Sequence, residues 1–248
     1  MTRRRRLGAS VSAGWRAFVR RRTAVFFTFL FPALIVFIFG ALVRTGPEAG
    51  GLFAEPPGYY VPAYLAVVVL LTPLSRVGST VARHREDARF QKLATTPLSR
   101  GEWLLAETLV NGAVIAVAGV LLVGLLVLLT GAAVRPAPVV LAFVATGVVL
   151  FCGVGAVIGR VADSQDGVIA ASNTVGFPLL FLSETFVPPT LLPAWFAPVV
   201  ELSPLTYFAR GVRAATYGDG AVWSNLAVLG ALAVVAFAAG AILLPWTE

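Results

Sequence analysis

Residues 85–130 read REDARFQKLATTPLSRGEWLLAETLVNGAVIAVAGVLLVGLLVLLT and join a short charged segment to a long, largely apolar run. The run from Trp103 to Thr130 exceeds the roughly 20 residues that a helix needs to cross a bilayer core about 30 Å thick. The whole chain repeats this contrast, since 58% of its 248 residues are hydrophobic and only 12% are charged. Soluble domains carry about 25% charged residues. The sequence therefore predicts an integral membrane protein.

Five further stretches have the length and composition of membrane-spanning helices, so we expect an all-α fold with six spans. The expected spans are residues 23–43, 60–81, 103–130, 139–158, 168–186 and 226–244. Basic residues are concentrated before the first span and in the connection after the second. By the positive-inside rule, both of these segments and both termini are predicted to lie in the cytoplasm. Residues 23–248 would then form one transmembrane domain.

Residues 1–22 have the pattern of an amphipathic helix that lies in the membrane interface. Trp15 and Phe18 fall on an apolar side, whereas Arg16 and Arg20 face elsewhere. A helix with an aromatic apolar face and an arginine-rich polar face binds at the headgroup level. The alternative interpretation is a disordered tail that only sets the orientation of the first span.

The charged segment between the second and third spans has two helical stripes. Phe90 and Leu93 form an apolar stripe, and Arg85, Arg89 and Lys92 form a basic stripe at i, i+4 and i+7. A loop that only sets topology needs no apolar stripe, so the segment is predicted to be a helix that docks a soluble partner. An ordinary positive-inside loop is the alternative. The expected contact residues are Arg85, Glu86, Arg89, Phe90, Lys92, Leu93, Thr96 and Pro97.

A defined corner follows this helix. Pro97 forces Thr96 out of helical geometry, and Ser99 with Glu102 forms an S-x-x-E capping box that starts the third span. A rigid corner transmits displacement from a docked partner to the membrane helices, whereas a flexible loop does not.

Two other regions carry candidate functional residues. Asn173 and Thr174 lie one turn before Pro178 in the fifth span, where they would either line a central cavity or form hydrogen bonds between helices. The Pro-rich connection after this span starts a helix at Ser203 and has aromatic residues suited to the interface. We interpret it as a re-entrant hairpin at the outer mouth, with a Pro-rich surface loop as the alternative. The residues expected to form an outer gate are Glu184, Pro204, Tyr207 and Arg213.

These two connections resemble the ABC-2 type transporter permeases, in particular the daunorubicin-resistance-like and the lipid- or polysaccharide-exporting half-transporters. The family's second cytoplasmic loop commonly reads R-E-x-G-T-L-E-R-L-x-x-T-P-L-S-R, and Ala88, Arg89 and Gln91 stand here where Gly, Thr and Glu are usual. The matching residues of this loop are Arg85, Glu86, Leu93, Thr96, Pro97, Leu98, Ser99 and Arg100. Those of the outer L-S-G-x-F-x-P…L-P-x-W…P-L-T-Y…R pattern, in which Glu184 replaces Gly, are Leu182, Ser183, Phe186, Pro188, Leu192, Pro193, Trp195, Pro204, Leu205, Thr206, Tyr207 and Arg213.

The resemblance implies a permease subunit of an exporter, in a dimer of permeases with two separate ATPase subunits that bind ATP and Mg. In agreement, the sequence contains no G-x-x-x-x-G-K-[ST] phosphate-binding motif. Apolar spans with few charges suit a hydrophobic or amphipathic substrate, such as a drug or a lipid-linked molecule. We expect no catalytic residues, no metal and no nucleic-acid partner, and we expect the chain to lie in the inner (cytoplasmic) membrane of a bacterial cell.

An ion-coupled secondary transporter of a small hydrophobic solute is the alternative function. Such proteins usually keep an acidic group deep in the membrane, and no Asp or Glu falls in the middle of an expected span. An intramembrane protease is disfavoured because the single histidine, His84, lies in the charged loop. A channel is disfavoured because the polar residues within the spans are sparse, and a scaffold gives no reason for the corner at Pro97.

Overall fold

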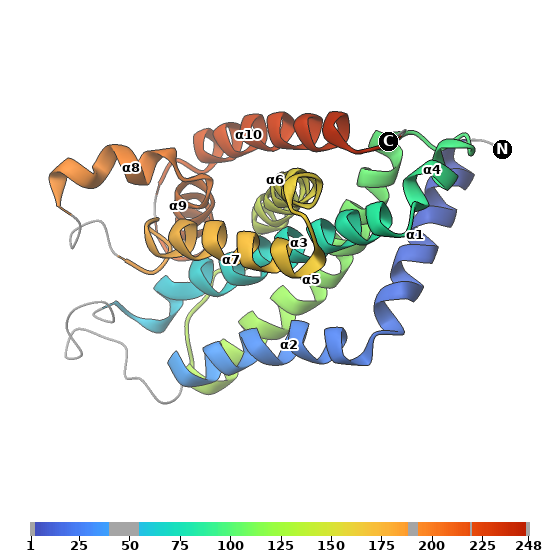
Figure 1. The fold of residues 1–248 in the computed structure, drawn as a ribbon. Helices are drawn as coiled ribbons and strands as arrows, with labels where there is room; N and C mark the ends of the chain where they lie inside the picture. The colour runs from blue at the N-terminus through green and yellow to red at the C-terminus, as the bar shows by residue number, and fades with distance from the viewer. Residues whose placement is uncertain (1–2, 40–54, 188–192, 219, 247–248) are drawn as a thin grey trace.

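The computed structural model describes residues 3–39, 55–187, 193–218 and 220–246, and the regular secondary structure among them is helical (Figure 1). The helices in chain order are α1 Arg3–Val19, α2 Arg22–Phe37, the 3-10 helix η3 Pro57–Tyr60, α3 Val61–Glu86, α4 Arg89–Ala94, α5 Arg100–Thr130, α6 Val139–Val161, α7 Gln165–Phe181, the 3-10 helix η5 Ala194–Phe196, α8 Ala197–Leu202, α9 Pro204–Thr216 and α10 Val222–Leu243. The all-α fold expected from the sequence is therefore confirmed.

Within the described residues, four helices are long and apolar enough to cross a membrane. They are Pro57–Glu86, Arg100–Thr130, Val139–Val161 and Val222–Leu243, with mean hydropathy between 1.7 and 2.9. The fifth predicted span, residues 168–186, ends early because α7 stops at Phe181. There the Ser183 hydroxyl donates to the Leu180 carbonyl at 3.1 Å and closes the last turn. The end of the first predicted span, residues 40–43, lies outside the described residues.

The centre of the bundle is formed by α3 and α6, with α10 along one side and α2 along the other (Figure 1). Glycines on α6 let the backbones approach closely. A Cβ atom built at Gly155 would lie 2.7 Å from the Leu74 carbonyl oxygen of α3, and one at Gly153 would lie 2.4 Å from the Ala236 carbonyl of α10. Small residues at helix contacts are the common solution where water supplies no hydrophobic driving force between helices.

The two ends of the bundle carry different accessory elements. At one end, α1, α4 and the last described residues gather around the start of α5 (Figure 1). At the other end, α9 packs across α3, α6 and α10. Its apolar face is fully buried, because Leu205, Phe208 and Val212 have no exposed surface. This arrangement gives the protein one end for the charged corner and another for the outer connection.

The close contact of α6 with α10 predicts the effect of a single methyl group. Replacing Gly153 by Ala should lower the free energy of unfolding by about 1–3 kcal/mol, because the new Cβ must displace the backbone at Ala236. The midpoint of thermal unfolding in detergent, followed by tryptophan fluorescence, measures the change. Gly124→Ala is the matched control, since no heavy atom lies within 4 Å of a Cβ at that position. Equal midpoints for Gly153→Ala and the unmodified protein would contradict the packing described.

Candidate functional site

The connection between α3 and α5 is a well-defined corner, as the sequence predicts. The corner begins with Ala88, whose φ of 52° is in the left-handed region, directly before α4. The Thr96 hydroxyl donates to the Leu93 carbonyl at 2.6 Å and ends α4 before Pro97. The predicted capping box is then formed: the Glu102 backbone NH donates to Ser99 Oγ at 3.2 Å, and the Ser99 backbone NH donates to Glu102 Oε2 at 3.0 Å.

Phe90 does not face solvent, in contrast to the docking position expected for it. Its side chain is 2% exposed and packs against three other rings. The ring centroids of His84 and Trp103 lie 5.2 Å from that of Phe90, and Trp246, just after α10, lies 5.6 Å away. Phe90 therefore anchors α4 in the bundle. Leu93 is half-buried beside it, and the solvent-exposed residues between Arg85 and Leu98 are Glu86, Asp87, Ala88, Arg89, Gln91, Lys92, Ala94, Thr95, Thr96 and Pro97.

Arg85 and Glu86 bind the corner to the connection between α6 and α7. Arg85 Nη1 lies near three backbone carbonyl oxygens at the end of α6 and donates to those of Gly159, Arg160 and Ala162 at 3.2, 2.9 and 2.8 Å. A cation at a helix C-terminus is favoured because the last carbonyls lack helical partners. Glu86 Oε2 also accepts a hydrogen bond from Gln165 Nε2 at 3.2 Å. The half-buried Arg85 therefore binds α3 to the end of α6, and the exposed Glu86 adds a surface contact with α7.

Glu102 joins the corner to the N-terminal helix. Its side chain is only 6% exposed, and Oε1 lies 3.2 Å from both Arg3 Nε and Arg6 Nη2 of α1. Arg100 Nη1 donates to the Ile242 carbonyl at the end of α10 at 3.0 Å. Polar contacts from one short segment thus reach α1, α6, α7 and α10, so a force applied to the corner would act on most of the bundle.

The outer connection forms a second polar cluster. Glu184, which is 5% exposed, accepts two hydrogen bonds from the guanidinium of Arg210, one of them from Nε at 2.8 Å. These hydrogen bonds raise the pKa of Arg210 above its ordinary value. Arg213 Nη2 donates to the Glu184 backbone carbonyl at 2.9 Å, and its Cζ lies 4.1 Å from the centroid of the Tyr59 ring. Tyr59 in turn packs edge-on against Tyr217 at 6.0 Å.

Two of the four residues expected at the outer gate, Glu184 and Arg213, therefore meet in this cluster. Pro204 occupies the first position of α9, and Tyr207 is half-buried against the apolar core. Sequence reasoning left Arg210 and Tyr59 out of the gate. The opposite charges of Arg210 and Glu184 were the available signal, but their separation of 26 residues hides the pairing until the chain has folded.

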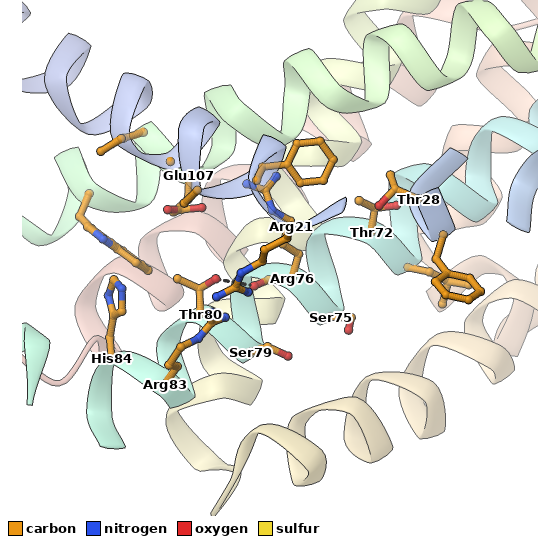
Figure 2. A pocket seen from close by; sticks show the side chains of 18 of the residues that line it. Arg21, Thr28, Thr72, Ser75, Arg76, Ser79, Thr80, Arg83, His84 and Glu107 are labelled. Atoms are coloured by element: carbon orange, nitrogen blue, oxygen red, sulfur yellow. Dashed lines mark hydrogen bonds between the residues drawn. The ribbon is translucent and has the colours of Figure 1, made fainter. Parts of the chain in front are cut away.

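A cavity of about 760 Å³ lies between the α1–α2 hairpin and α3, beside the corner (Figure 2). Its polar wall is a stripe on α3 with spacings of three and four residues: Thr72, Ser75, Arg76, Ser79, Thr80 and Arg83. From the sequence we expected only sparse polar residues in this span. Their spacing of three and four residues, which places them on one face of a helix, could have identified the stripe. Arg21, from the link between α1 and α2, and Glu107 of α5 also line the cavity.

The three residues predicted to line a central cavity are divided by the structure. Asn173 of α7 lines the cavity, whereas Thr174 and Pro178 are exposed on the same helix and do not. The Thr174 hydroxyl donates to the Ala170 carbonyl at 2.8 Å within α7. Outside the five residue ranges that the structure leaves undescribed, no group of three or more potential metal ligands was found.

Apolar helices of spanning length, a rigid polar corner and a polar cluster at the far end describe a membrane transport subunit. Residues 5–217 match the family of ABC-2 type transporters, which are membrane components of ABC transport systems, and the chain belongs to this family. It is also 34% identical over 68 residues to the daunorubicin resistance ABC transporter permease protein DrrB1 of Streptomyces coeruleorubidus. That match covers 27% of this chain and 24% of the relative's length.

The left-handed backbone at Ala88 predicts a stabilising substitution. Ala88→Gly should raise the free energy of unfolding by about 0.5–1 kcal/mol, because glycine adopts positive φ without the Cβ clash that an L-residue meets. Chemical or thermal unfolding in detergent measures the effect. Ala94→Gly is the control at the end of α4 and should have the opposite sign, since it only weakens a helix. A lower stability for Ala88→Gly would contradict the conformation at this position.

Because the carboxylate of Glu184 is buried and paired, its replacement should destabilise the end of the bundle that holds α9. Glu184→Gln removes the negative charge that Arg210 binds and should lower the free energy of unfolding by roughly 1–3 kcal/mol. The double variant Glu184→Gln/Arg210→Gln should be less destabilised than the sum of the two single variants. The difference is the coupling energy between the two side chains, which the double-mutant cycle measures. Asp163→Asn, at an exposed position between α6 and α7, is the control and should leave stability unchanged. A coupling energy of zero would rule out the pair.

Proposed function

We propose that the chain is the membrane-spanning permease subunit of an ATP-driven exporter whose ATP hydrolysis takes place on a separate subunit. Membership of the ABC-2 type transporter family supports the transport role. The corner around α4 is the observation that supports placing transport and ATP hydrolysis on separate subunits. Its outer face is polar and exposed, while its inner face is anchored by Phe90 in the bundle. Such an element can receive a mechanical force from a soluble partner and pass it to membrane helices.

In this proposal the chain crosses the membrane six times, with α2 and α7 as the first and fifth spans. Their described apolar lengths, residues 25–37 and 165–181, are below the usual spanning length of about 20 residues. Short spans are accommodated by local thinning of the bilayer. An even number of spans agrees with the gathering of α1, α4 and Trp246 at one end, which the basic residues assign to the cytoplasm. The segment η5–α8–α9 would be the re-entrant hairpin at the outer end.

The exposed face of α4 is the proposed docking surface for the ATPase. Arg89 and Lys92 offer positive charge there, and Gln91, Thr96 and Pro97 are exposed beside them. ATP and Mg bind the ATPase and not this chain. Closure of the ATPase upon nucleotide binding would push α4, and the contacts of Arg85 and Glu86 would transmit the displacement to α6 and α7. The Phe90 cluster would transmit it to α3, α5 and the end of α10.

We infer an assembly of two permeases, most simply two copies of this chain, with two ATPase subunits. A single bundle exposes large apolar side chains along α2 and α7, including Phe27, Phe31 and Phe177. Lipid or a second permease covers such faces. The complex would lie in the cytoplasmic membrane of a bacterial cell, as expected for a chain with no polar domain of its own among the described residues.

The transported substrate is proposed to be hydrophobic or amphipathic, because the chain is 58% hydrophobic and most of its charged groups are confined to the two ends of the bundle. The relative DrrB1 is named for daunorubicin resistance, which favours a drug or antibiotic as one candidate and a lipid-linked molecule as another. The cluster of Glu184, Arg210 and Arg213 would close the exit until α9 moves away from Tyr59. Family membership disfavours the ion-coupled alternative.

A charge reversal on α4 tests the docking surface. Lys92→Glu should reduce the stimulation of the partner ATPase by the permease at least about tenfold, because like charges at an interface disfavour binding by several kcal/mol. The variant should still insert and fold, since Lys92 is exposed. The measurement is ATP hydrolysis by the partner ATPase, reconstituted with the permease in liposomes.

Arg135→Glu provides a matched control, because Arg135 is equally exposed but lies at the opposite end of the bundle. It should leave ATPase stimulation unchanged. Phe90→Asp is a poor test, since a charge in the aromatic cluster would unfold the corner itself. Full ATPase stimulation and transport by Lys92→Glu would rule out docking at this face.

A further inference from the structure

The cavity beside α3 combines a polar wall and an apolar wall. Ser75, Arg76, Ser79 and Thr80 line one side, as Figure 2 shows for the labelled side chains. Phe27 and Phe31 of α2 with Val67, Val68 and Leu71 of α3 provide the apolar surface. Its volume of about 760 Å³ falls within the range of about 300–1,000 Å³ typical of ligand sites. Such a lining suits an amphiphile better than a purely polar or purely apolar ligand.

The charge inside the cavity is positive. Arg21, Arg76 and Arg83 line it, and Figure 2 shows the guanidinium groups of Arg76 and Arg83 pointing into the same space. Glu107 of α5 is the acidic residue of the lining and offsets one of these charges. Arg89 also borders the cavity, but Asp87 Oδ2 pairs with its Nε at 3.0 Å. The remaining arginine charge therefore has no acidic side chain of the lining to balance it.

Hydrogen-bond donors in the cavity also remain unused. Arg83 Nε is buried and has no hydrogen-bond partner in the part of the chain that the structure describes. Arg76 Nη1 donates to Asn111 Oδ1 at 3.2 Å, and its Cζ lies 4.7 Å from the centroid of the Phe18 ring. A guanidinium carries five N–H donors, so these contacts leave several available. Burying an unpaired donor is unfavourable, and an anionic oxygen would satisfy it.

We propose that this cavity binds the phosphate-bearing headgroup of an anionic amphiphile taken from the adjacent leaflet. Arg21, Arg76 and Arg83 would hold the phosphate oxygens, the hydroxyls of Ser75 and Ser79 would complete the polar contacts, and the acyl chain would lie along Phe27 and Phe31. Basic pockets between membrane helices favour lipid headgroups for the same electrostatic reason. The binding itself does not depend on ATP, whereas its role in export rests on the proposed function.

The same charge excludes a cationic amphiphile. An anthracycline such as daunorubicin carries a protonated amine at neutral pH and would meet uncompensated arginines. The site also borders the corner, because Leu93, Leu98 and Trp103 line it. A bound headgroup would therefore fix α1 and α3 relative to α4 and connect the presence of the anionic amphiphile with the docking surface.

Binding can be measured on the purified permease in neutral detergent without its ATPase. The protein used keeps Trp103, which lines the cavity, and has phenylalanine in place of Trp15, Trp195, Trp223 and Trp246. Phosphatidylglycerol with brominated acyl chains should quench Trp103, whereas brominated phosphatidylcholine at the same concentration should quench it far less. Arg83→Gln should weaken phosphatidylglycerol binding about tenfold, and raising the salt concentration should weaken it as well. Arg21→Gln should have the same effect and serves if Arg83→Gln folds poorly. Equal quenching by the two lipids would overturn the proposal.

Three controls separate this site from general attraction of lipids. Arg20→Gln removes the same charge from an exposed residue next to Arg21 that does not line the cavity, and it should leave binding unchanged. Daunorubicin should fail to displace brominated phosphatidylglycerol, and displacement would contradict the charge selectivity. Inorganic phosphate should displace it only weakly, and equal potency would assign the site to a soluble phosphate. If the permease stimulates the ATPase but does not bind phosphatidylglycerol, the lipid site is refuted and the docking proposal is not. If it binds phosphatidylglycerol but does not stimulate the ATPase, the docking proposal is refuted and the lipid site is not.

Discussion

A polar group that leaves water must find its partner inside the protein, and this constraint arranges the charged residues of the bundle. At one end Arg85 binds the free carbonyls of α6, and Glu102 binds the arginines of α1. At the other end Arg210 binds Glu184. Between the two ends, α3, α6 and α10 pack through apolar and small residues, so the middle of the bundle holds few groups that would need a polar partner.

In the proposed function, the same contacts would transmit force from the ATPase to the bundle. The corner is stiff because its backbone donors and carbonyls are satisfied by Ser99, Glu102 and Thr96, and because Phe90 fills an aromatic cluster. Loosening any one of these would leave α4 docked but mechanically separate from the bundle. The strained backbone of Ala88 shows that the turn is imposed by its surroundings, since an isolated L-residue disfavours positive φ.

Local chemistry was predictable from the sequence, and long-range pairing was not. The capping box of Ser99, the corner at Pro97 and the start of α9 at Ser203 depend on neighbouring residues and were predicted correctly. The inward orientation of Phe90 depends on Trp246, which is more than 150 residues away along the chain. A short apolar stripe does not reveal whether its partner is another protein or the same chain. The early end of α7 was missed, although the polar residues Ser183, Glu184 and Thr185 interrupt the apolar run directly after Leu182.

The cavity beside α3 is one of the places in the described chain where a buried polar atom has no hydrogen-bond partner. Two other arginines, Arg85 and Arg213, donate to backbone carbonyls. Arg83 Nε does not, although Ser79 and His84 lie in the same lining. The ligand proposed for this cavity would supply an acceptor for the donor and so remove the unfavourable energy of leaving it unpaired. The unpaired donor of Arg83 is thus unfavourable for folding and favourable for the binding that we propose.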